Sequence, residues 1–374
     1  MKIRKRLYPY EAELLGLQPK EPEQHASQNR NQNRYYITLE QWDSIKKMRE
    51  EGLGEVFKNQ KVDPKDVKHL WKKEKGSSLF IKNPLYQDVS DQKFEEIRQQ
   101  VIDDLKKFSP KFPKLKREKS KDPHLLVIDP ADVHLGKLCS EFETGDKYNN
   151  EIAIKRCHEG VEGILTQVSG WNIDKILFVA GNDILHVDTP RRTTTSGTPQ
   201  DTDGMWYDNF LLAKNLYVDL LMKLLSVADV HFVYNPSNHD YQSGFFLADV
   251  VQTYFRNCKN ITFDCSMAHR KTYRYGNNLI GTTHGDGAKT NDLALLMASE
   301  SKDWSECKRR YCYAHHVHHK VSKDFIGCTF ETLRSPSGTD SWHHRQGYQH
   351  APKAIEGFLH HKEHGQVARL THYF

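Results

Sequence analysis

The sequence lacks the long apolar segments of a secreted or membrane-spanning protein. No apolar run approaches the roughly 18 residues that a membrane-spanning helix needs. The first residues, MKIRKRLYPYEAELLG, are basic, but neither an apolar stretch nor a small-residue cleavage site follows them, so we expect no secretory signal. We therefore predict a cytoplasmic protein without a membrane partner.

Cysteines are few and follow no pattern, and the chain has no internal repeat. The seven cysteines are odd in number and form no Cys-x-x-Cys pair, whereas disulfide frameworks and zinc ribbons need regularly spaced cysteines. No period of about 20 to 50 residues recurs, which argues against a solenoid. The cysteines are expected to be reduced thiols.

Length and charge predict two domains of different character. At 374 residues, of which 37% are hydrophobic, the chain exceeds the size at which a single core stops growing, about 250 to 300 residues. Residues 1–121 contain 28 Lys and Arg against 19 Asp and Glu, and the remainder contains 26 against 30. This asymmetry suggests that one part attracts polyanions while the other holds metal cations. Lysine-rich helices that are merely solvated would give the same balance.

The N-terminal third contains segments of different composition. Residues 1–34 include the polar, low-complexity run EPEQHASQNRNQNR and are predicted to form an irregular arm. Residues 109–121 are rich in lysine and contain proline, so they are predicted to be a basic linker with the charge to contact phosphates. Residues 35–108 between them are predicted to form a small basic helical domain.

Helix signals define that small domain. Thr38 and Gln41 have the spacing of a capping box, and apolar residues follow at three-residue intervals, namely Trp42, Ile45 and Met48. A second helix is predicted to begin at Asp63-Pro64, and a third to span 88–108. Two short basic helices joined by a glycine-containing turn resemble a nucleic-acid-reading helix-turn-helix, although any small helical bundle produces this pattern.

The pattern after Asp122 alternates between short apolar runs and longer helical ones, which predicts an α/β layered domain over residues 122–374. Strands are predicted at 125–128, 175–180, 230–234, 279–283 and 311–314. Helices are predicted at 151–168 and 206–227. In such domains, ligands bind at the carboxyl ends of the strands.

Each of the five predicted strands is followed by a short loop rich in Asp, Asn or His. In chain order these loops contain DVHLG (132–136), GNDILH (181–186), SNHD (237–240), HGD (284–286) and HVH (316–318). Any one of them alone is more often a turn or a hydrogen-bonded histidine. Together they offer imidazole, carboxylate and amide donors, which suit Mn, Fe, Zn or Ni ions. Two such ions about 3.5 to 4 Å apart can clamp a phosphate and activate water.

The five loops resemble, in the family's order, the signature of the calcineurin-like metallophosphoesterases: D-x-H, G-D, G-N-H-D, H and G-H-x-H. The resemblance implies a β-sandwich flanked by helices, with a dinuclear metal site that hydrolyses phosphoesters. The sequence departs from the signature at three positions. Asn182 is inserted before Asp183, Ser237 replaces a glycine, and His315 replaces another, which affects the loops rather than the ligand side chains.

The resemblance implies a role for each residue of these loops. The first metal ion would be held by Asp132, His134 and His318, the second by Asn238, His284 and His316, and Asp183 would bridge the two. His239 would donate a proton to the leaving oxygen or orient the phosphate, and Asp240 would fix the orientation of His239. Mn²⁺ is the ion that we expect first, with Fe, Zn or Ni as alternatives.

The segment after Asp183 resembles the G-D-L-F-H segment of the SbcD-type DNA repair nucleases, which gives His186 a role in placing a nucleic-acid phosphate. Arg191 and Arg192 follow in a flexible loop and are candidate phosphate contacts. Together with the basic N-terminal third, they favour a DNA exonuclease or endonuclease. A phosphatase or phosphodiesterase acting on nucleotides or phosphoproteins, whose N-terminal domain serves for oligomerisation, is the alternative. A DNA-binding regulatory protein with a degenerate site is the second.

Overall fold

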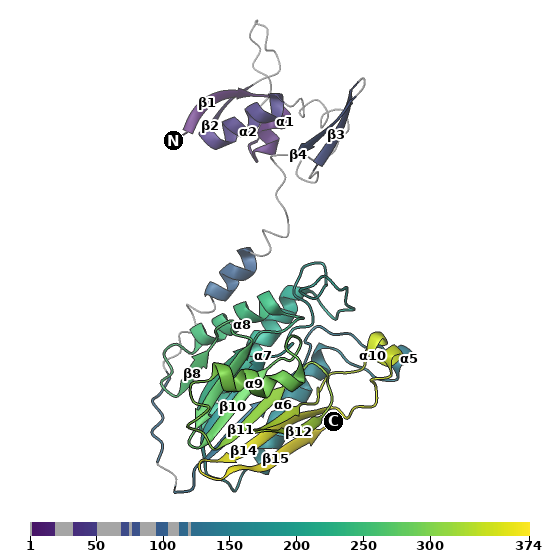
Figure 1. Cartoon of the computed structure of the whole chain (residues 1–374). Helices are drawn as coiled ribbons and strands as arrows, with labels where there is room; N and C mark the ends of the chain where they lie inside the picture. Colours follow the sequence, from purple (N-terminus) through teal and green to yellow (C-terminus); the bar gives the residue numbers. More distant parts are fainter. Residues whose placement is uncertain are drawn as a thin grey trace, which may run out of the picture. The chain divides into compact units, whose positions relative to one another are not determined.

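The computed structural model describes residues 2–18, 33–50, 69–74, 77–82, 95–103, 112–118 and 121–374. The chain separates into two compact units, Met1–Gln100 and Val101–Phe374 (Figure 1). In the part of the chain that is described, no helix combines the length and the apolarity that crossing a bilayer requires.

Two β-sheets form the centre of the second unit. The six-stranded sheet contains β5 (His124–Asp129), β6 (Ile173–Gly181), β7 (Asp229–Asn235), β8 (Ile261–Asp264), β14 (Ala354–His361) and β15 (Gly365–Tyr373), in the order β15-β14-β5-β6-β7-β8. The five-stranded sheet contains β9 (Arg270–Tyr275), β10 (Asn278–Thr283), β11 (Arg309–Ala314), β12 (Val321–Phe325) and β13 (Cys328–Thr332), in the order β12-β13-β11-β10-β9.

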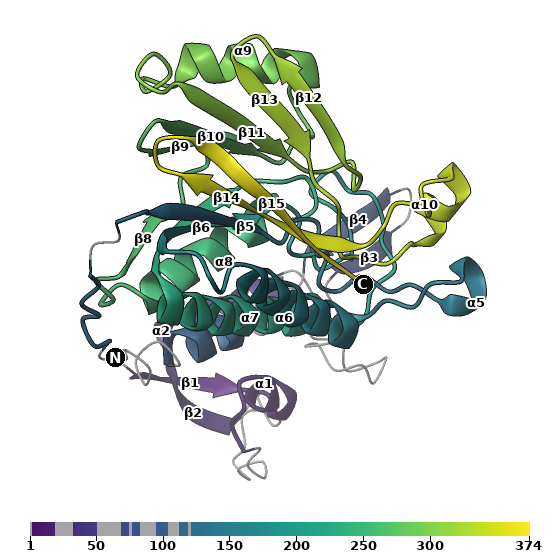
Figure 2. The ribbon, with the colours of Figure 1, turned by 90° about the horizontal axis from the view of Figure 1, so that it is seen from below.

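The two sheets pack face to face, and helices cover their outer faces. Buried apolar side chains from both sheets meet between them, among them Val127, Leu177, Ile280, Tyr313 and Phe358. The helices are α5 (Glu141–Thr144), α6 (Asn150–Gln167), α7 (Trp206–Val227), α8 (Tyr241–Tyr254), α9 (Thr290–Glu300) and α10 (Ser341–Gln346). Figure 2 shows α6, α7 and α8 on one side of the pair of sheets and α9 on the other. The predicted layered α/β sandwich is confirmed.

Strand direction explains where the polar loops gather. β5, β6, β7 and β8 are mutually parallel, as are β10, β11 and β13. β5 and β10 are buried along their whole length. Parallel strands that are covered on both faces are built from near-continuous apolar runs. Each of the five predicted strands is present, and so are both predicted helices. The loops that follow these strands therefore lie at the carboxyl edges of the two sheets.

The first unit differs from the sequence prediction. The prediction of an irregular arm over residues 1–34 is wrong at both ends of this range. β1 (Lys2–Leu7) pairs antiparallel with β2 (Asn33–Thr38), and α1 (Pro9–Leu14) follows β1. The low-complexity run that prompted the prediction lies largely outside the described residues. At its flanks, alternating exposed and buried positions form a two-stranded sheet with one face on the core of this unit.

The helical domain predicted for 35–108 is only partly helical. The capping box is present in α2 (Leu39–Glu50), where the Thr38 backbone N–H donates to Gln41 Oε1 at 2.9 Å. The start of the helix predicted from Asp63 lies outside the described residues. Beyond it, β3 (His69–Glu74) and β4 (Ser77–Lys82) form an antiparallel pair, so the helix-turn-helix prediction is wrong in this segment. The aromatic and β-branched residues of HLWKKE and SSLFIK favour strands.

The predicted linker 109–121 is partly packed onto the second unit. Residues 95–103 are helical, in agreement with the third predicted helix. Residues 112–118 contact the second unit next to the starts of β7 and β8, where the Leu115 backbone N–H donates to Asn260 Oδ1 at 3.1 Å. Arg117 forms an ion pair with Asp229 at 2.9 Å, so its charge is already paired. The second unit accordingly begins at Val101, before the predicted boundary at 122.

Gly181 ends β6 with a φ of 81°, and a Cβ there would overlap the backbone carbonyl oxygen of Asn235. Gly197 has a φ of 92° and open space around the same position. Both Gly→Ala variants pay roughly 1 to 2 kcal/mol for the left-handed backbone, but only Gly181→Ala adds a clash of about 1 to 3 kcal/mol. We expect urea unfolding to show the larger loss for Gly181→Ala. Equal losses would contradict this account of the turn.

Candidate metal centre

Donor side chains from five loops meet at the carboxyl edges of the two sheets. Their ligand atoms form two groups, each within 4.8 Å: Asp132, His134 and His318 make up the first group, and Asp183, His284 and His316 the second. The groups adjoin, because the His316 backbone N–H donates to Asp132 Oδ2 at 3.2 Å. The structure thus brings together residues that are more than 180 positions apart in the sequence.

The donor atoms of the first group are as far apart as two ligand atoms of one metal ion. His134 Nε2 lies 3.3 Å from His318 Nε2, and His318 Nε2 lies 3.3 Å from Asp132 Oδ1. Two donors bound tetrahedrally at about 2.0 to 2.1 Å from one ion lie about 3.3 Å apart. Asp132 Oδ1 is buried without a hydrogen-bond partner. A cation would satisfy this oxygen, so the group fits a divalent metal ion.

Asn238, the predicted amide ligand, lies beside the second group. His284 Nε2 lies 3.2 Å from Asp183 Oδ2 and 2.9 Å from Asn238 Oδ1. The other carboxylate oxygen of Asp183 accepts the backbone N–H of His239 at 2.9 Å. Asp183 thereby joins the donors of the second group to the loop after β7. Carboxylate, amide and imidazole donors in this arrangement also suit a divalent metal ion.

Electrostatics favour the metal-binding forms of His134, Asp132 and Asp183. Burial, reinforced by the neighbouring histidines and Lys137, holds the pKa of His134 well below its usual range. Burial would raise the pKa of Asp132, but the attraction of His318 outweighs it and lowers that pKa. For Asp183, the attraction of His284 and His239 likewise outweighs burial and lowers the pKa. Neutral imidazole and ionised carboxylate are the forms that bind metals. Burial would lower the pKa of His284, but the attraction of Asp183 outweighs it and raises that pKa to about 9, so a bound metal ion would have to displace a proton there.

Backbone strain is concentrated in the donor loops. Among the described residues, those other than glycine with positive φ are all at the site apart from Arg192: Asp132 (52°), His134 (51°), Asn182 (51°), Asp183 (61°), His316 (71°) and His318 (57°). Each such residue costs of order 1 to 3 kcal/mol and persists only where its surroundings impose it, as at functional sites. Asn182, the inserted residue, adopts one of these left-handed backbone conformations, and Asp183 still lies at the site.

The two residues that replace glycines of the family signature support the loops. Ser237 Oγ accepts the backbone N–H of Asp183 at 2.7 Å and donates to Asp240 Oδ1 at 2.6 Å. The buried His315 ring donates from Nδ1 to the Thr283 carbonyl oxygen at 2.9 Å, and its Nε2 lies 2.9 Å from Asp129 Oδ2. Both side chains therefore make hydrogen bonds that a glycine lacks.

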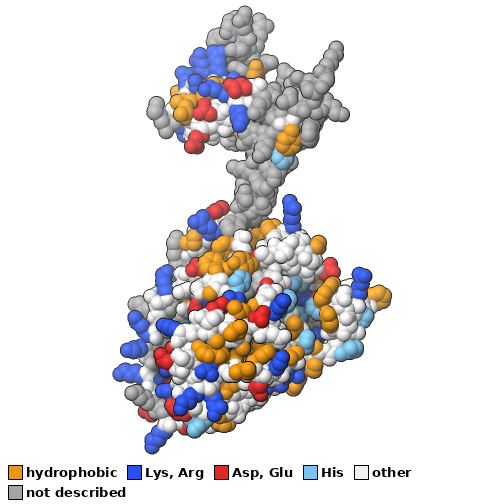
Figure 3. Space-filling model, viewed as in Figure 1, with side chains coloured by type: hydrophobic (Ala, Val, Ile, Leu, Met, Phe, Trp, Pro, Cys, Tyr) orange, Lys and Arg blue, Asp and Glu red, His pale blue; other side chains and the backbone are white. Residues whose placement is uncertain are grey.

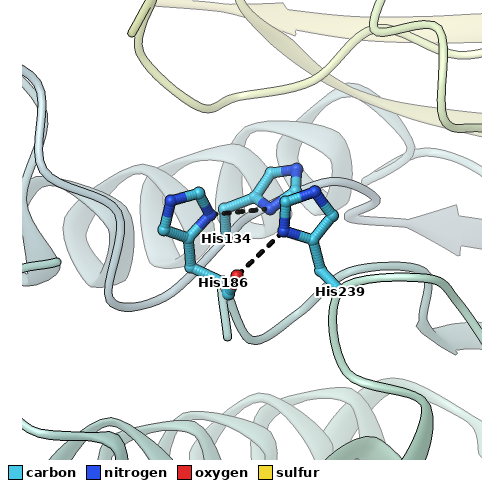
Figure 4. A group of neighbouring side chains, drawn as sticks. All are labelled: His134, His186 and His239. Atoms are coloured by element: carbon cyan, nitrogen blue, oxygen red, sulfur yellow. Dashed lines mark hydrogen bonds between the residues drawn. The ribbon is translucent and has the colours of Figure 1, made fainter. Parts of the chain in front are cut away.

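His134, His186 and His239 form a cluster of rings beside the first group (Figure 4). His186 is buried, and its Nδ1 lies 3.4 Å from Nδ1 of His134, so its ring contacts a donor residue instead of open space. His239 is half-buried and donates from Nδ1 to the backbone carbonyl of His186 at 2.8 Å. That bond leaves Nε2 of His239 available for chemistry.

Asp240 does not orient His239 as the sequence predicted. Its oxygens accept hydrogen bonds from the Leu185 backbone N–H at 2.9 Å and from Ser237 Oγ. Burial, together with the nearby Asp183 carboxylate, raises the pKa of Asp240 to about 8. A largely protonated Asp240 near neutral pH is a poor partner for an imidazolium. The backbone carbonyl of His186 holds His239 instead, and Asp240 holds the loop.

Arg191 and Arg192 are exposed and lie outside the donor groups. Their loop is attached to the start of α8 by Asp188, whose carboxylate accepts the backbone N–H groups of Gln242 and Ser243 at 3.1 and 2.8 Å. A carboxylate at a helix N-terminus is stabilised by the unpaired N–H groups there. Their predicted contact with phosphate stays a prediction.

Sequence reasoning missed a charged network on the other side of the site. The buried Lys137 ammonium lies 2.9 Å from Asp340 Oδ2. Asp340 caps α10 and accepts from His343 Nδ1 at 2.7 Å, and the His343 ring stacks on His318 at 5.0 Å. No local motif could have shown this, because the partners are about 200 residues apart. The network fixes α10 beside the first donor group.

A cavity of about 270 Å³ lies between α10 and the first donor group. Its lining includes His318, His319, His343, Tyr348, His350 and Lys353. These side chains combine potential positive charge, hydrogen-bond donors and one aromatic ring.

Comparison with known proteins gives fold likenesses only. No protein-family model matches the sequence, and no curated protein matches it. Among solved structures, an archaeal phosphodiesterase is 9% identical, with 67% of this chain and 99% of that chain covered and a TM-score of 0.33. Vps29 from Entamoeba histolytica, solved with Zn²⁺, is 12% identical (67% and 98% covered, TM-score 0.29). A predicted phosphoesterase from Streptococcus pneumoniae TIGR4 is 14% identical (67% and 97% covered, TM-score 0.27). At these values no family is established.

Asp340→Asn leaves the buried Lys137 ammonium without its carboxylate. Removing one partner of a buried ion pair typically costs about 3 to 5 kcal/mol, so we expect a clear fall in the free energy of unfolding in urea. The exposed Asp201 has no ion pair among the described residues, and Asp201→Asn is the matched control, expected to be nearly neutral. Indistinguishable unfolding curves for the two variants would contradict the network.

Proposed function

We propose that the second unit is a metal-dependent phosphoesterase of the calcineurin-like type, and that it hydrolyses phosphodiester bonds of DNA. The observation that supports this most is the pair of adjoining donor groups with His239 beside them. The order of the five loops along the chain and the layered sandwich agree with the proposal. The cytoplasmic expectation and the preference for Mn²⁺ belong to the same proposal.

The side chains divide the work between holding cations and moving a proton. Asp132, His134 and His318 would hold one ion, and Asn238, His284 and His316 the other, with Asp183 shared. Two bound divalent ions would polarise the phosphate and supply activated water. The side chains that would bind these ions are already held close together by the strained loops.

His239 is the residue that we assign to proton transfer. Its Nδ1–H is committed to the His186 carbonyl, so Nε2 is the atom that can protonate the leaving oxygen. The ring is accessible, unlike that of His186. Such general-acid catalysis typically contributes about 10²- to 10⁴-fold. His186 would act through His134, by fixing the orientation of that ligand.

A nucleic-acid substrate is favoured over a small phosphoester by the surroundings. The cavity beside His318 has the charge and the aromatic ring to receive a nucleotide next to the cleaved bond. The excess of 28 Lys and Arg over 19 Asp and Glu in residues 1–121 would add affinity for a polyanion. Nucleotides or phosphoproteins as substrates are the rival. A DNA-binding protein with a degenerate site is less favoured, because each donor position keeps a metal-binding side chain.

Purified protein should cleave labelled single- or double-stranded DNA with Mn²⁺ and lose this activity with chelator. His239→Ala should reduce kcat by about 10²- to 10⁴-fold while bound metal stays unchanged. Asp183→Asn should reduce both. His364 is exposed in the turn between β14 and β15, so His364→Ala serves as the control.

Two outcomes would redirect the proposal. Turnover of bis-p-nitrophenyl phosphate with DNA left intact would favour the small-substrate phosphodiesterase. Metal binding without any hydrolysis, but with DNA binding, would favour the regulatory protein.

A further inference from the structure

The outer face of the β1–β2 pair in the first unit contains unusually regular positive charge. Along β1, the exposed residues Lys2, Arg4 and Arg6 alternate with the less exposed Ile3, Lys5 and Leu7. Side chains two residues apart point to the same face of a strand. Three cationic side chains therefore project from one side of a six-residue strand.

The neighbouring strand extends this face. In β2, Arg34 and Tyr36 are exposed, and 64% of the Tyr36 surface is accessible. The strands pair Arg4 with Tyr36 and Arg6 with Arg34, so these side chains share a face as direct cross-strand neighbours. We call the surface formed by Lys2, Arg4, Arg6, Arg34 and Tyr36 the basic ribbon. In Figure 3, blue side chains gather over the region where Figure 1 places these strands.

Packing fixes which face is outward. Leu7, Tyr35 and Ile37 on the inner face are buried against Ile45 and Met48 of α2. The inward-facing Lys5 is used within the unit, where its ammonium lies 4.8 Å from the Trp42 ring. A shift of one residue in the pairing of β1 with β2 would turn the cations inward and expose this core. The ribbon therefore presents its charges to solvent in a fixed register.

Acidic residues of the first unit form ion pairs with cations outside the ribbon. The buried Glu11 forms an ion pair with Arg49 at 2.7 Å, and Asp43 pairs with Lys46. Among the described residues, none of the four ribbon cations has a carboxylate partner. Like charges placed directly opposite each other, as in Arg6 and Arg34, are destabilising in a sheet. A polyanion seated on the ribbon would remove this repulsion.

We propose that the basic ribbon binds the backbone of single-stranded DNA, with Tyr36 stacking on an unpaired base. The proposal rests on the proposed function, since it takes DNA as the substrate class, and it replaces the helix-turn-helix with a sheet surface. Phosphates neutralised by arginine and lysine supply sequence-independent affinity. An exposed ring among cations is the combination that single-strand-binding proteins use. The Arg4 guanidinium, 6.0 Å from the Tyr36 ring, supports that ring from one side.

The ionic contribution gives a quantitative test. The full-length protein is titrated onto fluorescein-labelled (dT)20 in chelator, so that hydrolysis is absent, and anisotropy is recorded over a range of salt concentrations. Each phosphate contact on a single strand contributes about −0.7 to the slope of log K against log salt concentration. The double variant Arg4→Gln/Arg34→Gln should therefore reduce the magnitude of the slope by about 1.4.

Two further variants separate charge from stacking. Lys46→Gln/Lys47→Gln on α2 makes the same change of charge at exposed positions outside the ribbon and should leave the slope nearly unchanged. Tyr36→Leu should weaken binding about tenfold without changing the slope, because stacking releases no counterions. Circular dichroism establishes that all variants fold, and their turnover of bis-p-nitrophenyl phosphate with Mn²⁺ should match that of the parent protein.

An unchanged salt slope in Arg4→Gln/Arg34→Gln, or equal effects of both double variants on that slope, would contradict DNA binding by the basic ribbon. So would ribbon-dependent binding to phosphatidylserine vesicles with none to (dT)20. Failure of the proposed function is a separate result. A protein that hydrolyses no phosphodiester but loses DNA binding in the ribbon variants would retain the inference and refute the nuclease.

Discussion

The architecture of the second unit follows from burying cation-binding groups at the edges of two packed sheets. Asp132 and Asp183 are almost wholly buried, and a buried carboxylate is costly unless it is paired or bound to a metal. The adjoining imidazoles offset part of that cost, and Asp132 Oδ1, which lies near His318 but accepts no hydrogen bond, shows where the compensation is incomplete. Parallel strands end at one edge, so distant loops can supply the donors together.

The loops store strain that the rest of the unit must offset. Positive φ at six non-glycine donor-loop positions is maintained by specific hydrogen bonds. Ser237 holds the turn at Asp183, and His315 ties the last donor loop to Asp129 and β10. Behind the donors, the sandwich core is apolar and fully buried, which gives these loops a rigid base. The Lys137–Asp340 pair adds a second support from the C-terminal segment.

The sequence predicted the second unit far better than the first. Buried parallel strands leave long apolar runs, and the donor residues come directly after them, so both were visible in the sequence. The partner of Lys137 was not, because a contact over about 200 residues leaves no local pattern. In the first unit, low complexity beside Asn33 concealed a strand, and the residues of β3 were mistaken for the continuation of a helix. Asp240 was misassigned because adjacency to His239 does not determine where a side chain points.

The central claim is that the donor groups hold two metal ions, and metal stoichiometry tests it most directly. Protein loaded with Mn²⁺, freed of excess ion and measured by inductively coupled plasma mass spectrometry should contain two ions per chain. His318→Ala and His284→Ala, one from each group, should each retain about one ion. Less than one ion bound by the parent protein, or full binding by both variants, would contradict the account.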